Sequence, residues 1–125
     1  MKNLQLSLKR KWFEMTKAGI KTEDYREINS YWIKRLMSKK YNYLYPTTQE
    51  SIDGITKHID PNFLVKHHSK KFDLNIMTLG YPKSNDTERI LKLEHKGIRI
   101  RTGNPEWGAE PGKLYFVIMH GDIIQ

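Results

Sequence analysis

The stretch Gly19-Ile20-Lys21-Thr22-Glu23-Asp24-Tyr25-Arg26 decides the fold that this sequence predicts. Its β-compatible residues favour a strand, but four of its eight residues are charged. That density of charge is unusual for a strand beside a hydrophobic core. The segment is therefore either a solvated edge or a strand whose charges line a cleft.

The alternation of a strand places Thr22, Asp24 and Arg26 on one face. Lys21 lies at the start of the strand, where a bulge could turn its side chain. Asp24 and Arg26 can form a charge-assisted pair, or Arg26 can offer its planar guanidinium to a phosphate or carboxylate. The pair is thus either a structural ion pair that holds a barrel closed or part of a binding site.

Local patterns predict the elements on both sides of this stretch. Residues 4–8 alternate Leu with polar residues, the period of a half-buried strand. Residues 10–18 follow a helical period and end at Gly19, which suits the left-handed conformation. Ser30 is expected to cap a second short helix, whose apolar stripe lies within residues 32–37.

The second half of the chain predicts further strands, at residues 72–79, 89–95, 98–101 and 114–119. We expect Lys96-Gly97 to form a tight turn between two of them. Arg99 and Arg101 alternate with apolar residues, so one face of that strand is strongly basic. The last run is nearly all apolar, as expected for a central strand.

Residues 41–71 fit this pattern least well, and we interpret them as an insertion. They predict a helix near residues 49–58 and a turn at Asp60-Pro61. The whole chain, residues 1–125, predicts a single domain. Its fold class is α+β, mainly β, with a small barrel of five to six strands and two or three short helices.

Composition narrows the classes of function. There are 22 Lys and Arg against 14 Asp and Glu, a formal charge of +8 and a pI near 9.6, which favours polyanionic partners. The absence of cysteine excludes disulfides, thiolate metal sites and a cysteine nucleophile. His67-His68 point apart, so no metal site is indicated, and no cofactor or membrane is expected. A cytoplasmic location follows as an expectation.

The stretch at residues 19–26 resembles the motif of the ASCH family, Gly-x-Lys-x-x-Glu-x-Arg. Gly19, Lys21 and Arg26 match it, and Asp24 stands in the Glu position. Trp12-Phe13 and residues 31–36 and 103–110 look like segments of phage and prophage-type ASCH proteins. The resemblance implies a PUA-like barrel with a cleft beside the motif that accepts RNA or a modified nucleoside.

The first functional hypothesis is a non-catalytic module that binds RNA or a nucleotide. Tyr31 and Arg35 combine an aromatic ring with a cation, as expected where bases stack and phosphates are neutralised. Trp107 lies in a stiff loop and either stacks on a base or plugs the barrel end. The residues predicted to bind are Lys21, Asp24, Arg26, Tyr31, Arg35, Arg99, Arg101 and Trp107.

Two alternatives stand beside it. Some ASCH relatives hydrolyse acetylated cytidine with a Lys, a Thr and a Glu, which implies a nucleoside amidohydrolase using Lys21, Asp24 and Glu106. This chain has Asp24 where those relatives have Thr, and a lysine near two carboxylates normally stays protonated, which favours binding over base catalysis. The other alternative is a phage accessory protein that contacts a protein partner through residues 41–71.

Overall fold

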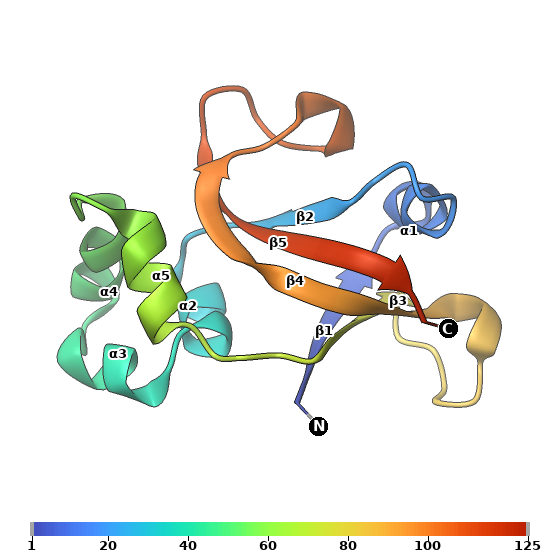
Figure 1. The fold of residues 1–125 in the computed structure, drawn as a ribbon, viewed down its shortest axis with the longest axis horizontal. Coiled ribbons are helices and arrows are strands. Elements are labelled where there is room, and N and C mark those ends of the chain that lie inside the picture. Colours follow the sequence, from blue (N-terminus) through green and yellow to red (C-terminus); the bar gives the residue numbers. More distant parts are fainter. Residues whose placement is uncertain (1, 125) are drawn as a thin grey trace. The chain divides into compact units, whose positions relative to one another are not determined.

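Five β-strands form one mixed sheet in the computed structural model, which describes residues 2–124 (Figure 1). They are β1 (Asn3–Leu8), β2 (Glu23–Arg26), β3 (Leu74–Leu79), β4 (Ile90–Thr102) and β5 (Leu114–Ile123). Their order is β1-β3-β4-β5-β2, with β3 parallel to β1 and antiparallel to β4. The fold is α+β, and its sheet is a curled half-barrel.

Several short helices accompany the sheet. The α-helices are α1 (Arg10–Lys17), α2 (Ser30–Leu36), α3 (Lys39–Leu44), α4 (Thr48–Thr56) and α5 (Pro61–His68). Two single 3₁₀ turns, η1 (Thr87–Arg89) and η2 (Pro105–Trp107), lie in the later loops. The described residues therefore hold more α-helices than the two or three predicted, because the segment around residues 41–71 is helical.

The chain divides into two compact units. The first unit contains the N-terminal segment up to Asp24, Lys71–Gly97 and the C-terminal segment from Ile118. In it, β1 buries Leu4, Leu6 and Leu8 on one face, as their alternation predicts. Because each unit draws on segments far apart in sequence, neither is continuous in the chain. The single domain of residues 1–125 stays a prediction.

The second unit contains Tyr25–Lys70 and Ile98–Val117. Its helices α2 to α5 gather together in Figure 1, and their apolar faces form a core that includes Ile33, Leu36, Ile55 and Val65. Side chains cap these short helices: Asn29, Ser38, Thr47 and Asp60 each accept a hydrogen bond from a backbone N–H of the first turn. The expected helix near residues 49–58 is confirmed as α4.

Three local predictions are wrong, each for a specific reason. Asn29 rather than Ser30 caps α2, because its side-chain oxygen reaches the N–H of Trp32. Lys96-Gly97 is not a turn: β4 continues through it, with Gly97 at a φ of 121° that favours glycine. Asp60-Pro61 starts α5, as its N-cap and first residue, instead of forming an isolated turn.

The predicted end of the first helix is confirmed. The first helix ends before Gly19, which has a φ of 76°. No helix among residues 2–124 has the length and apolar character needed to cross a bilayer.

Tyr41 joins α3 to α4 and generates a prediction about Gly54. Its buried hydroxyl donates to the carbonyl oxygen of Ser51 at 2.6 Å. A Cβ at Gly54 would lie 2.6 Å from that hydroxyl oxygen and 3.1 Å from the ring of Tyr45. We expect Gly54→Ala to lower the free energy of unfolding by about 1–3 kcal/mol, measured by urea denaturation.

The opposite result would contradict this packing. Ala is the better helix former by about 1 kcal/mol, so a Gly54→Ala protein that gains stability would show that no close contact limits this position.

Candidate functional site

The motif Lys21 and Asp24 meet as a buried ion pair in the first unit. The Lys21 ammonium donates to Asp24 Oδ1 and, at 2.8 Å, to the carbonyl oxygen of Glu23. The two side chains are 2% and 5% exposed. This position arises because Lys21 precedes β2 and so escapes the strict alternation of the strand.

His120 engages the other oxygen of Asp24. It lies on β5, is almost completely buried, and its Nε2 is 2.6 Å from Asp24 Oδ2. The shared strand face allowed Arg26 as one possible partner of Asp24, and in the structure Lys21 and His120 bind the two oxygens of Asp24. Both carboxylate oxygens of Asp24 are thus hydrogen-bonded inside the protein.

Two more side chains extend the hydrogen-bonded chain across β3 and β4. Asn75, fully buried on β3, has its Nδ2 2.7 Å from His120 Nδ1 and 3.3 Å from the carbonyl oxygen of Met119. Its Oδ1 is 2.7 Å from Nδ1 of His95. With Asn75 oriented so, His120 accepts at Nδ1 and donates at Nε2, and His95 donates at Nδ1. We call Lys21, Asp24, His120, Asn75 and His95 the buried polar chain.

The charge of Asp24 is stabilised within this chain. Burial raises the pKa of Asp24, but the hydrogen bond with His120 and the positive charge of Lys21 outweigh it, and the pKa falls to about 2. At neutral pH the carboxylate is therefore ionised.

His95, at the other end, is held neutral. Burial of the ring, followed by electrostatic interactions with His120 and with the charge of Lys71, lowers the pKa of His95 to about 4. The neutral ring also contacts Phe72, with ring centroids 5.4 Å apart.

The buried polar chain has a chemical consequence. Asp24 is bonded at both oxygens, and both ring nitrogens of His120 are engaged. In this conformation both groups are hydrogen-bonded within the protein and are buried from solvent. Trp12 covers one side, with the Lys21 ammonium 5.9 Å from the centre of its ring.

A second cluster, which is partly exposed, is centred on α2 in the second unit. The guanidinium of Arg35 lies 5.3 Å from the ring centre of Tyr31 and 5.6 Å from that of Trp32. The two rings meet edge to face at 5.1 Å, and Arg26 lies 5.1 Å from the ring centre of Trp32. Tyr31 is 59% exposed. We call these four residues the α2 aromatic–arginine cluster.

The remaining predicted residues belong to the second unit. Arg99 and Arg101 are exposed on β4 and flank the buried Ile100, so the predicted alternation is confirmed. Trp107 is half-buried in η2. Glu106 is exposed beside it, with its N–H donating to Asn104 Oδ1 at 2.9 Å.

Sequence reasoning missed His120, Asn75 and His95. A usable signal was present: His120 interrupts the strand after an apolar run, and Asn75 lies among apolar strand residues. A polar side chain at a buried strand position needs a partner, so these residues predict one another only when the strand pairing is known.

Comparison with known proteins found no matching family model, no matching curated protein and no matching solved structure. Within residues 2–124 there is also no group of three His, Cys, Asp or Glu side chains arranged to hold a metal ion. The functional assignment therefore rests on the chemistry of the two clusters.

The buried ion pair predicts a large effect of neutralising Asp24. Asp24→Asn removes the negative charge beside the buried Lys21 ammonium, and we expect a loss of about 3–5 kcal/mol in the free energy of unfolding. Glu14→Gln is the control, because Glu14 pairs with Arg10 at 3.8 Å while both side chains are more than half exposed. Chemical denaturation that shows equal, small effects would contradict the structural role of Asp24.

The lowered pKa of His95 predicts a pH dependence of stability. The unfolded chain binds the proton near the ordinary value of 6.5, whereas the folded protein binds it only near 4. The stability contributed by neutral His95 is therefore complete above pH 6.5 and is lost as the pH falls toward 4. His95→Gln should reduce the pH dependence of the melting temperature over this window, whereas His67→Gln should leave that pH dependence unchanged. An unaltered slope in His95→Gln would contradict the assignment.

Proposed function

We propose that the protein is an ASCH-type, PUA-like module that binds single-stranded RNA through the α2 aromatic–arginine cluster. The observation that carries the proposal is the exposed Tyr31 ring held beside the Arg35 guanidinium, 5.3 Å away. An aromatic ring with a neighbouring cation offers a base a stacking surface and its phosphate a counter-charge.

The arrangement of α2 supports this reading. Tyr31 and Arg35 are separated by four residues and so share one face of the helix. The apolar residues Ile33 and Leu36 of α2 are fully buried, which fixes the opposite face against the core. The stacking pair is therefore presented by a firmly packed element, which lowers the entropic cost of binding.

Charge supports an RNA partner as well. The chain carries a formal charge of +8, and the exposed Arg99 and Arg101 belong to the same unit as α2. In this proposal Arg26 orients the Trp32 ring, and Trp107 supplies a further aromatic contact. Lys21 and Asp24 support the strand that carries Arg26 and do not contact the ligand directly.

A hydrolase acting on an acylated cytidine is the second candidate. The observation that favours it is the burial of Lys21 beside Asp24 and His120, because clusters of titratable groups with perturbed pKa values concentrate at active sites. It ranks second because the ionised Asp24 carboxylate binds the Lys21 ammonium and so favours its charged form. A lysine that acts as a nucleophile or base must first lose a proton.

The RNA proposal predicts a specific loss in Tyr31→Ala. Removing the ring should weaken binding of a short single-stranded RNA by about 1–3 kcal/mol, which corresponds to roughly five- to 150-fold. Fluorescence anisotropy at two salt concentrations measures it, and wild-type affinity should fall steeply with salt.

Tyr43→Ala is the matched control, because Tyr43 is 84% exposed on the neighbouring α3. Equal losses in the two variants would contradict a stacking role for Tyr31. No binding of RNA by the wild type would refute the proposal and favour a protein partner, for which the exposed Leu44, Ile59 and Phe63 offer apolar contacts.

The hydrolase candidate has its own test. Wild-type protein incubated with N4-acetylcytidine should release cytidine, and a folded Lys21→Met variant should release none. Chromatographic detection of cytidine decides the matter, since no product from the wild type removes this candidate.

A further inference from the structure

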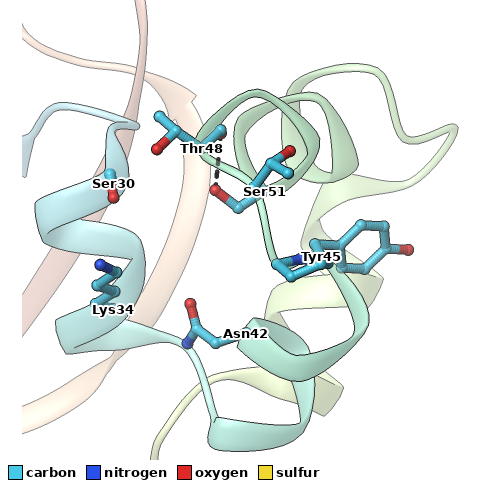
Figure 2. A pocket seen from close by; sticks show the side chains of 8 residues that line it. Ser30, Lys34, Asn42, Tyr45, Thr48 and Ser51 are labelled. Atoms are coloured by element: carbon cyan, nitrogen blue, oxygen red, sulfur yellow. Dashed lines mark hydrogen bonds between the residues drawn. The ribbon is translucent and has the colours of Figure 1, made fainter.

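A small polar pocket lies between α2 and α4 in the second unit, and Figure 2 shows its walls. Its volume is about 90 Å³, well below the roughly 300–1,000 Å³ of sites that enclose a whole small molecule. The polar side chains that line it are Ser30, Lys34, Asn42, Thr47, Thr48 and Ser51. A pocket of this size and polarity fits one polar part of a larger ligand.

Asn42 gives the pocket a directed acceptor. Its Nδ2 donates to the carbonyl oxygens of Ser38 at 3.0 Å and Met37 at 3.4 Å. These bonds fix the amide so that its oxygen faces the space between α2 and α4, as Figure 2 shows. The Asn42 oxygen is therefore ready to accept a hydrogen bond from a hydroxyl or amine of a ligand.

Lys34 gives the pocket a cation. Among the described residues its ammonium has no carboxylate partner, and its backbone carbonyl oxygen accepts a hydrogen bond from the Lys70 ammonium at 2.9 Å. Within the same described part of the chain, the hydroxyls of Ser30 and Thr48 also have no side-chain hydrogen bond. These three groups can all donate to an anionic or carbonyl oxygen.

The other two hydroxyls are already used by the protein. Ser51 donates to the carbonyl oxygen of Thr48 at 2.9 Å, the dashed line in Figure 2, and Thr47 donates to Glu50 at 2.8 Å. The pocket therefore presents one fixed acceptor opposite one cation and two hydroxyl donors.

We propose that this pocket takes a ribose–phosphate unit of RNA and reads its 2′-hydroxyl. The 2′-hydroxyl donates to the Asn42 oxygen, while the neighbouring phosphate accepts from Lys34 and the hydroxyl of Ser30. Because DNA lacks this hydroxyl, the pocket gives the protein a preference for RNA.

The position of the pocket on α2 ties it to the binding surface already proposed, on which this inference rests. Ser30 and Lys34 are four residues apart and form one ridge of the helix, and Tyr31 and Arg35 form the next. A strand whose base stacks on Tyr31 can therefore place its backbone over the pocket.

The test compares three oligonucleotides of one sequence: RNA, RNA with 2′-fluoro groups, and DNA. The 2′-fluoro group keeps the ribose pucker but cannot donate a hydrogen bond. Wild-type protein should bind RNA about two- to tenfold more tightly than 2′-fluoro RNA, the value of one net hydrogen bond. Asn42→Ala should bind both equally, with its fold checked by circular dichroism.

Lys34→Met provides a second variant that does not alter the amide. It should weaken RNA and 2′-fluoro RNA by the same factor and reduce the salt dependence by about one phosphate contact. Lys39→Met, at an exposed position of α3, is its control.

The possible outcomes separate failure of this inference from failure of the proposed function. Equal wild-type affinity for RNA and 2′-fluoro RNA, or a difference that persists in folded Asn42→Ala, overturns this inference. If that binding still depends on Tyr31, the proposed function stands and only the 2′-hydroxyl reading fails. No binding of any oligonucleotide overturns both. Should Asn42→Ala fail to fold, the wild-type comparison and Lys34→Met decide.

Discussion

The structure of the first unit depends on how it holds one buried carboxylate. Removing the charge of Asp24 from water costs several kcal/mol, and only partners inside the protein offset that cost. Lys21 and His120 supply them from two different segments, one on each oxygen of Asp24. Asn75 then fixes the His120 ring, and His95 fixes the Asn75 amide. Four strands, β2, β3, β4 and β5, thus each contribute one member of the buried polar chain.

Because Lys21 and Asp24 are buried and hydrogen-bonded to each other, we propose the exposed α2 surface, and not the charged motif, as the ligand surface. Polar groups that satisfy one another in the interior rigidify a structure but offer little to a partner. The α2 aromatic–arginine cluster has the opposite character, because its Tyr31 ring and Arg35 side chain are exposed. Both clusters place a cation beside an aromatic ring, and their difference in solvent exposure is the reason we propose a supporting role for the first and a binding role for the second.

Sequence patterns predicted those features that depend on neighbouring residues. The alternation of Leu4, Leu6 and Leu8, the helix end before Gly19 and the helix α4 all follow from local periodicity and capping. The predicted turn at Lys96-Gly97 was wrong because a glycine with a positive φ occurs both in tight turns and within strands. Only the pairing of β4 distinguishes the two cases.

The candidate site residues that the sequence singled out are likewise those whose signal lies in neighbouring residues. Lys21 and Asp24 stood out because charges are rare in strands, and Tyr31 with Arg35 because they combine ring and cation on one helix face. His120 joins Asp24 across 96 positions of the chain, and Asn75 joins His120 across 45. No local pattern specifies such contacts. The pocket between α2 and α4 likewise needs the packing of two helices to exist.

The central claim is that α2 is the surface that meets RNA, and nuclear magnetic resonance tests it most directly. In ¹H–¹⁵N spectra of the labelled protein titrated with single-stranded RNA, the account predicts shifts concentrated at the amides of Ser30, Tyr31, Lys34, Arg35 and Asn42. Binding that shifts other regions while leaving the amides of α2 unchanged would contradict it.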